Sequence, residues 1–206
     1  MSNPACRCRG RRPGCRWRSS APSRSSSPRS WYGRGARSTP SHRTSQPALL
    51  RGLKAARTTG SPIGFLALDV DRLKSLNDRY GHLTGAEGVR TVGHIIGRRL
   101  PPAAVACRYG GDEFAIAIPD CDLAQANRVA DELREAVRAT APTLAGRAFP
   151  AATLTISVGA TSSSAAADAW LALGPDGLEA GEWLFNRADR ALYQAKEGGR
   201  DRVGVA

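Results

Sequence analysis

Short runs of apolar residues recur along the chain from about residue 47 onward. The run Ile63–Val70 is apolar almost throughout and too short for a helix, as in strands that are buried on both faces. Other runs alternate apolar and polar positions, which is typical of a strand with two different faces. We therefore expect strands at residues 63–70, 103–108, 114–118, 152–159 and 202–205.

Longer segments between these runs repeat their apolar residues every three to four positions, as one face of a helix does. The clearest stripe consists of Val89, Val92, Ile96 and Leu100. Pro101 follows it directly, and proline cannot continue a helix. The same reasoning predicts helices at residues 47–57, 72–77, 84–100, 122–140 and 183–196, with a loop or weak helix over 162–181.

The expected elements follow one another in the order α-β-α-α-β-β-α-β-α-β. This order predicts an α/β (α+β) sandwich, in which helices pack against a largely antiparallel central sheet built around a βαββαβ core. Residues Tyr109–Glu113 join two of the strands, so we expect a β-hairpin with glycines at its turn. All of these elements fall within a single domain, residues 47–206.

Residues 1–46 differ in composition from this domain. They contain eleven Arg and eleven Ser but no Asp, Glu, Leu, Ile, Val or Phe, and they carry +11 of the total formal charge of +12. A segment without these aliphatic residues and Phe cannot bury enough apolar surface to offset the entropy of ordering, which predicts a disordered tail. A transit peptide, an RNA-binding Arg/Ser tail and the product of a shifted reading frame or start are all compatible with this composition.

The domain behind the tail is nearly neutral, at +1. Its charge therefore gives no reason to expect specific nucleic-acid binding. The tail would bind nucleic acid only electrostatically, without sequence preference. The sequence contains no run of about 18 apolar residues, so we expect no transmembrane helix.

Acidic side chains stand at the ends of two expected strands. Asp69 closes the strand at 63–70, and Asp112 and Glu113 follow two glycines at the tip of the hairpin. If these strands are neighbours, the carboxylates converge at one edge of the sheet. Magnesium is commonly bound by one or two carboxylates together with substrate phosphates. A solvated turn also explains the same residues, so the pattern alone leaves both interpretations open.

Three separated motifs resemble the GGDEF domain of diguanylate cyclases. They are Leu68–Gly85 (LDVDRLKSLNDRYGHLTG), Arg108–Phe114 (RYGGDEF) and Ala188–Val203 (ADRALYQAKEGGRDRV). The motifs agree with the family in content and order, and the resemblance covers about residues 47–206. It implies a core like that of nucleotidyl cyclases and polymerase palms.

The resemblance also implies a role for each matched residue. Asp69, Asp112 and the carbonyl of Val70 would bind Mg²⁺, with Mn²⁺ as an alternative. Glu113 would support the metal or accept a proton, beside glycines that let the backbone approach the ligand. The remaining residues would bind the substrate GTP: Gly110 and Gly111 in the turn, Asn77 and His82 at the guanine, the amides of Arg72 and Leu73 at the phosphates, and Lys196 and Arg200 as a clamp on the triphosphate.

In this family two domains, each with one GTP, meet face to face and form cyclic di-GMP with release of two pyrophosphates. The resemblance therefore implies a bacterial, cytoplasmic enzyme that works as a homodimer. A sensory or coiled-coil segment usually precedes the domain, and we expect that segment to be missing from this sequence. The alternative is a catalytically inactive GGDEF-like module that binds GTP and acts in regulation.

The sequence departs from the family pattern at three places. Ala86 stands where the family usually has an Asp that binds the guanine edge, which predicts weaker GTP binding or relaxed base choice. Pro101–Ala104 replace an Arg-x-x-Asp product-inhibition site, which predicts no feedback inhibition there. Ser41–Pro47 match nothing in the segment that usually opens the domain, which fits a frame disruption or a wrong start. The retained acidic and basic residues favour the active enzyme over the inactive module.

Overall fold

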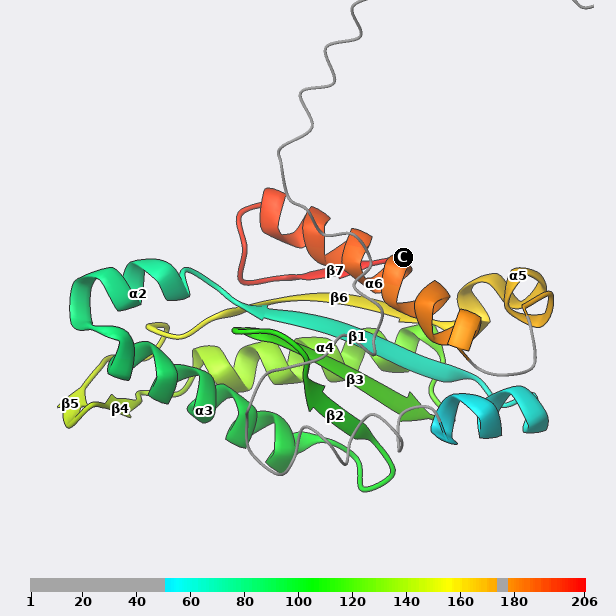
Figure 1. The fold of residues 1–206 in the computed structure, drawn as a ribbon, viewed down its shortest axis with the longest axis horizontal. Coiled ribbons are helices and arrows are strands. Elements are labelled where there is room, and N and C mark those ends of the chain that lie inside the picture. Colours follow the sequence, from blue (N-terminus) through cyan, green and yellow to red (C-terminus); the bar gives the residue numbers. More distant parts are fainter. Residues whose placement is uncertain (1–50, 174–177) are drawn as a thin grey trace, which may run out of the picture. The chain divides into compact units, whose positions relative to one another are not determined.

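A computed structural model describes residues 51–173 and 178–206 of the chain. A five-stranded sheet forms the middle layer, with helices on both of its faces (Figure 1). This architecture confirms the predicted α/β sandwich. Within the described ranges, no helix is long and apolar enough to cross a membrane.

The central sheet is built from β1 (Ile63–Val70), β2 (Val105–Arg108), β3 (Glu113–Pro119), β6 (Ile156–Ser162) and β7 (Val203–Val205). Their order across the sheet is β2-β3-β1-β6-β7. All neighbouring pairs are antiparallel except β6 and β7, which are parallel. The largely antiparallel sheet is therefore as expected. Its central strand is β1, whose apolar run is buried on both faces.

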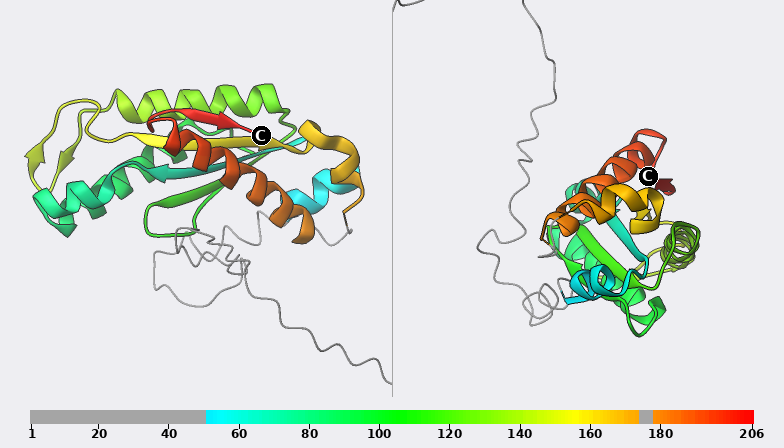
Figure 2. Two further views of the ribbon diagram at one scale, coloured as in Figure 1. Left: turned by 90° about the horizontal axis from the view of Figure 1, so that it is seen from above. Right: turned by 90° about the vertical axis from the view of Figure 1, so that its right-hand side faces the viewer.

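Two helices, α3 (His82–Arg99) and α4 (Leu123–Arg138), cover one face of the sheet, and α6 (Leu178–Glu197) covers the other (Figure 2). The predicted stripe of α3 is confirmed, because Val89, Val92 and Ile96 are buried in the core. Helix α4 begins with a capping box in which Asp122 and Gln125 exchange hydrogen bonds of 2.8 Å. The helices are α2 (Leu73–Tyr80), α3 (His82–Arg99), α4 (Leu123–Arg138), α5 (Ala167–Leu171) and α6 (Leu178–Glu197), with a 3₁₀ turn, η1, at Ser163–Ala166.

The strand predicted at 152–159 is wrong in its bounds, because β6 begins only at Ile156. Leu154 is buried, at 1% exposure, but it lies in an irregular segment that starts with Ala152 at φ 63°. The apolar position before β6 therefore reflects packing of Leu154 in the core and not strand pairing. A small hairpin of β4 (Thr143–Leu144) and β5 (Arg147–Ala148) was also not predicted.

Some of the sequence predictions lie outside the described residues. These are the tail at 1–46, the start of the first helix at 47–50 and part of the 162–181 segment, at 174–177. The rest of the first helix is confirmed, since residues 51–59 are helical and bury Leu53 and Ala56.

Candidate active site

The acidic residues that the sequence predicted to meet lie together at the ends of β1 and β3. Asp69 and Glu113 are cross-strand partners in the antiparallel register. The N–H of Val70 donates to the carbonyl of Asp112 over 3.1 Å, which fixes the hairpin tip against the end of β1. Directly opposed residues of an antiparallel pair place their side chains on the same face. Backbone pairing therefore holds these carboxyl-bearing residues side by side.

The turn between β2 and β3 is held by backbone contacts and by one arginine. The N–H of Tyr109 donates to the carbonyl of Glu113 over 3.0 Å. Arg108 donates to the carbonyls of Gly110 and Gly111, over 3.2 and 2.5 Å. A Cβ at Gly110 would come within 2.2 Å of Glu113 Oε2. Glycine at this position therefore avoids a clash with the Glu113 carboxylate.

Lys196 supplies positive charge to this acidic centre. Its Nζ lies 2.6 Å from Asp69 Oδ2, and both side chains are largely buried. Burial raises the pKa of Asp69, and the contact with Lys196 opposes that effect. Burial, followed by the nearby carboxylates of Asp69 and Asp112, raises the pKa of Glu113. Lys196 thus pairs with one of the three carboxylates of Asp69, Asp112 and Glu113, and the centre keeps an excess of negative charge.

This excess of negative charge fits a divalent cation. The side chains of Asp69 and Asp112 carry carboxylate oxygens, which are ligands of the kind that Mg²⁺ prefers. Among residues 51–173 and 178–206 there is no group of three or more His, Cys, Asp or Glu side chains placed to hold a metal.

Asn77 lies in α2 and packs against the start of α3. Its Oδ1 is buried and accepts no hydrogen bond within the described part of the chain. A Cβ at Gly85 would approach this oxygen to 1.9 Å, so the missing side chain gives the amide its position. A buried acceptor without a donor costs roughly 1–3 kcal/mol, which a ligand can recover by donating to it. His82 is the exposed first residue of α3.

The residues predicted to bind phosphate lie on two segments. Arg72 is the N-cap of α2, at φ 53°, and α2 has no capping side chain. The N–H groups of the first turn, beginning at Leu73, are therefore available to an anion. Lys196, in the last turn of α6, contacts the acidic centre directly. Arg200 follows that helix with an exposed side chain.

Sequence reasoning missed the contribution of Asp71, which is 7% exposed. Its Oδ1 accepts a hydrogen bond from Ser157 Oγ over 2.7 Å. Its Oδ2 accepts from Thr155 Oγ1 over 2.9 Å and from the N–H of Asp201 over 3.1 Å. Asp71 thus joins the end of β1 to β6 and to the loop after α6. The only sequence signal was a second carboxylate two positions after Asp69.

Comparison with known sequences decides the family. The sequence model described as "Diguanylate cyclase, GGDEF domain" matches residues 39–202. The chain belongs to the GGDEF domain family. The matched range includes the acidic centre, Asn77 and the loop after α6, so the GGDEF assignment covers all of the predicted site residues.

Two curated relatives show how this GGDEF domain compares with longer proteins. Diguanylate cyclase DgcP of Pseudomonas aeruginosa is 34% identical over 147 residues, which are 71% of this chain and 20% of that protein. Response regulator PleD of Caulobacter vibrioides is 34% identical over 152 residues, which are 73% of this chain and 31% of that protein. The chain therefore spans less than a third of the length of these two relatives.

Solved structures share the fold. The GGDEF domain of DgcB from Caulobacter crescentus, in complex with c-di-GMP, has a TM-score of 0.67 at 29% identity and covers 84% of this chain and 97% of that chain. Diguanylate cyclase SiaD from Pseudomonas aeruginosa, in complex with its activator SiaC, has a TM-score of 0.67 at 27% identity and covers 80% and 58%. The sandwich described above is thus the GGDEF fold.

Two of the departures from the family pattern lie in the described part of the GGDEF domain. Ala86 is exposed on α3, directly after Gly85. The segment Pro101–Ala104 forms a turn before β2, closed by the N–H of Ala104 and the carbonyl of Pro101 at 2.9 Å. Neither place carries the charged side chain that the resemblance leads one to expect.

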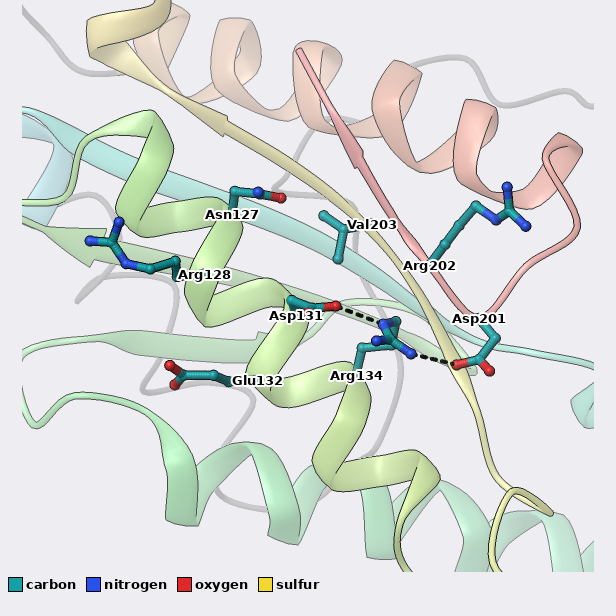
Figure 3. Close-up of a pocket in the computed structure, with 8 residues that line it drawn as sticks. All are labelled: Asn127, Arg128, Asp131, Glu132, Arg134, Asp201, Arg202 and Val203. Carbon is teal, nitrogen blue, oxygen red and sulfur yellow. Dashed lines mark hydrogen bonds and ion pairs between the residues drawn. The ribbon is translucent and has the colours of Figure 1, made fainter.

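A surface pocket of about 560 Å³ lies between α4 and the segment that leads into β7 of the GGDEF domain (Figure 3). None of the predicted site residues lines it. It is lined by Asn127, Arg128, Asp131, Glu132, Arg134, Asp201, Arg202 and Val203.

Proposed function

We propose that this GGDEF domain is a diguanylate cyclase that condenses two GTP molecules into cyclic di-GMP and two pyrophosphates across a homodimer. The observation that carries the proposal is the pairing of Asp69 with Glu113 at the strand ends, with Lys196 in contact with Asp69. Family membership supports it, because named relatives are diguanylate cyclases. A GTP substrate implies a cytoplasmic location.

The acidic centre would bind the metal and the triphosphate together. Asp69, Asp112 and the carbonyl of Val70 would hold Mg²⁺ or Mn²⁺, which neutralises charge on the α-phosphate and aligns the attacking hydroxyl. Lys196 lies 2.6 Å from Asp69, so its ammonium needs little movement to reach phosphate oxygens. Arg200 would add a bidentate contact to the phosphates.

Glu113 is the proposed proton acceptor. The 3′-hydroxyl of one GTP gives its proton to the Glu113 carboxylate, and its oxygen forms a bond to the α-phosphorus of the other GTP. The bond from that phosphorus to the bridging oxygen breaks, and pyrophosphate leaves. Burial and neighbouring carboxylates raise the pKa of Glu113, which makes it a stronger base than an exposed glutamate. One such step from each GTP closes the ring.

The base and the phosphates would be bound on either side of this centre. The unpartnered Oδ1 of Asn77 would accept a hydrogen bond from the guanine, and His82 would border the base. The N–H groups of Arg72 and Leu73 would donate to phosphate oxygens at the start of α2. These contacts position the nucleotide so that its α-phosphate lies beside Glu113.

An inactive GTP-binding regulatory module is the alternative, and one observation favours it. The exposed Ala86 supplies no carboxylate for the guanine edge. Such a module would bind GTP through the same residues without completing the reaction.

The decisive experiment incubates the protein at high concentration with Mg²⁺ and GTP and detects cyclic di-GMP by mass spectrometry. A cyclase forms the product, and its specific activity rises with protein concentration because two domains must meet. Asp112→Ala is the control and should form none. GTP binding without product at any protein concentration would establish the regulatory module, and the absence of both would reject both functions.

A further inference from the structure

The loop that carries Arg200 has an unusual backbone. Gly199, Arg200 and Asp201 have φ values of 116°, 69° and 47°. Residues other than glycine rarely adopt this left-handed backbone conformation. Two such residues in succession therefore persist only where surrounding contacts hold them. The contacts that hold this loop therefore also decide where the Arg200 guanidinium can reach.

The N–H groups of Gly199 and Arg200 donate to the carbonyls of Lys196 and Ala195, over 3.3 and 3.1 Å, and Asp201 adds the contacts that reach beyond α6. Its N–H donates to Oδ2 of the buried Asp71 over 3.1 Å. Its carboxylate accepts hydrogen bonds from Arg138 over 2.9 Å and from Arg134 over 3.4 Å. Both arginines belong to α4, which lies on the other face of the sheet from α6 (Figure 2). Beyond the end of α6, the loop is thus fixed through Asp201 by the end of β1 on one side and by α4 on the other.

Arg134 is fixed in turn by its own neighbours. Its side chain is only 12% exposed, and it also pairs with Asp131 at 2.9 Å and with Glu135 at 2.5 Å. Figure 3 shows Arg134 between Asp131 and Asp201, with its guanidinium directed at both. A guanidinium that is held at several points presents its remaining donor in a defined direction. Arg134 is therefore a firm support for Asp201.

We infer that Arg134 is a positioning residue for phosphate binding. Through Asp201, and together with Arg138, it holds the loop in the conformation that presents Arg200 to the triphosphate. The inference rests on the proposed function, because it requires Arg200 to bind phosphate. It gives α4 a part in substrate binding, although none of the predicted site residues lies on that helix.

A defined signature follows from this role. Loss of Arg134 should weaken the binding of ligands that carry phosphates. It should leave unchanged the binding of guanosine, which has no phosphate. Arg134→Gln removes the ion pairs and keeps a polar side chain. We expect its Kd for Mg²⁺–GTP, measured by calorimetry, to rise about three- to thirtyfold. Its Kd for guanosine should equal that of the wild type.

Arg128→Gln is the matched control. Arg128 lies on the same helix and lines the same pocket, but the ion pairs of Asp201 do not include it. Its Kd values for GTP and guanosine should both equal those of the wild type. Adding Arg200→Gln to Arg134→Gln should cause less further loss than Arg200→Gln causes alone, because both changes act on one contact.

Arg134 is largely buried, so Arg134→Gln could fail to fold, and circular dichroism would reveal such a defect. Arg138→Gln provides a second test of the inference in that case. Arg138 is 50% exposed and pairs with Asp201, so its loss should weaken GTP binding in the same direction without a folding defect. Unchanged GTP affinity in Arg138→Gln and in a folded Arg134→Gln would overturn the inference. A parallel loss of guanosine affinity would also overturn it. A wild-type protein that binds no GTP would reject the proposed function, and the inference with it.

Discussion

The position of the Asn77 side chain depends on the absence of a Cβ at Gly85. The amide of Asn77 occupies the space in which a Cβ of Gly85 would lie, and its Oδ1 is buried without a hydrogen-bond donor in the described part of the chain. Glycine lowers helix propensity, so Gly85 disfavours the helix in which it stands. Its presence is explained by the space that the Asn77 amide needs and not by the stability of α3.

Gly85→Ala should therefore weaken GTP binding without unfolding the protein. The new Cβ would turn the flexible Asn77 side chain away, and the loss of its hydrogen bond to the base should raise the Kd about tenfold. Gly97→Ala on the same helix is the control, because a Cβ there meets nothing within 4 Å. It should keep the GTP affinity and raise the free energy of unfolding by up to about 1 kcal/mol. Equal GTP affinities of the two variants in calorimetry would contradict the role of Asn77.

Ala86→Asp should strengthen GTP binding. The position is exposed on α3, one residue beyond Gly85, so a carboxylate can be added there without displacing the core. A charge-assisted hydrogen bond to the guanine contributes about 1.5–3 kcal/mol, which corresponds to a decrease in Kd of roughly ten- to a hundredfold. GTP affinity and turnover would both be measured. If neither improves, a carboxylate at this position is dispensable in this domain.

At the scale of elements, α6 packs on β6 through direct backbone contact. A Cβ at Gly159 would lie 1.9 Å from the carbonyl oxygen of Ala188 and 2.4 Å from the nitrogen of Leu192. Both are backbone atoms, so rotation of a side chain cannot relieve the overlap. The helix that carries Lys196 thus has its distance from the central sheet set by this glycine.

Gly159→Ala should lower the free energy of unfolding, measured in urea, by at least about 2 kcal/mol, because α6 must move away from the sheet. Gly52→Ala is a suitable reference, since a Cβ there meets nothing within 4 Å. That change lies in the helix at 51–59 and should be neutral or slightly stabilising. Wild-type stability of the Gly159 variant would show that α6 can move off the sheet without cost.

The turn before β2 leads to a prediction about regulation. Pro101–Ala104 contains no charged side chain, and phosphate recognition in proteins relies mainly on Arg, Lys and backbone N–H groups. We therefore expect no inhibition by cyclic di-GMP through this turn. Initial rates at increasing product concentration would show only competition with GTP. Non-competitive inhibition at low micromolar product would refute the prediction.

At the scale of the whole molecule, the charge is distributed unevenly along the sequence. Residues 1–46 carry +11, whereas the remainder carries +1. Deletion of residues 1–46 should therefore abolish retention of single-stranded RNA on a filter. For the full chain, the logarithm of the binding constant should fall linearly with the logarithm of salt concentration, since phosphate contacts release counterions. RNA binding by the shortened chain would place a nucleic-acid site in the domain instead.

The sheet and the main helices could be predicted because their signals are local. The apolar run of β1 and the stripe of α3 each lie within one segment, and burial of both elements agrees with them. The meeting of Asp69 with Glu113 also followed from sequence, because a strand end and a hairpin tip leave few possible arrangements once the strands are paired. Whether the proposed GTP site is active did not follow from these patterns.

Other features depend on contacts between distant segments and left no periodic pattern. The hairpin of β4 and β5 has two residues in each strand, too few for an alternation to be visible. Asp71 accepts a hydrogen bond from the backbone N–H of Asp201, which lies 130 positions later in the sequence. The left-handed conformation of Arg200 and Asp201 is set by such contacts and not by the two residues themselves. For these reasons, the sequence named the residue types of the site but not the supports that orient them.

The long span between Asp71 and Asp201 has a consequence for the order of assembly. During synthesis, β1 and β3 emerge early and can pair, which brings the carboxylates together while α6 is still being made. Lys196 and Arg200 reach them only when the last segment folds back, a long-range step that is intrinsically slow. A growing chain thus has these carboxylates in place before Lys196 and Arg200 are present. Nucleotide binding should appear late in the life of the nascent chain, and in a single step.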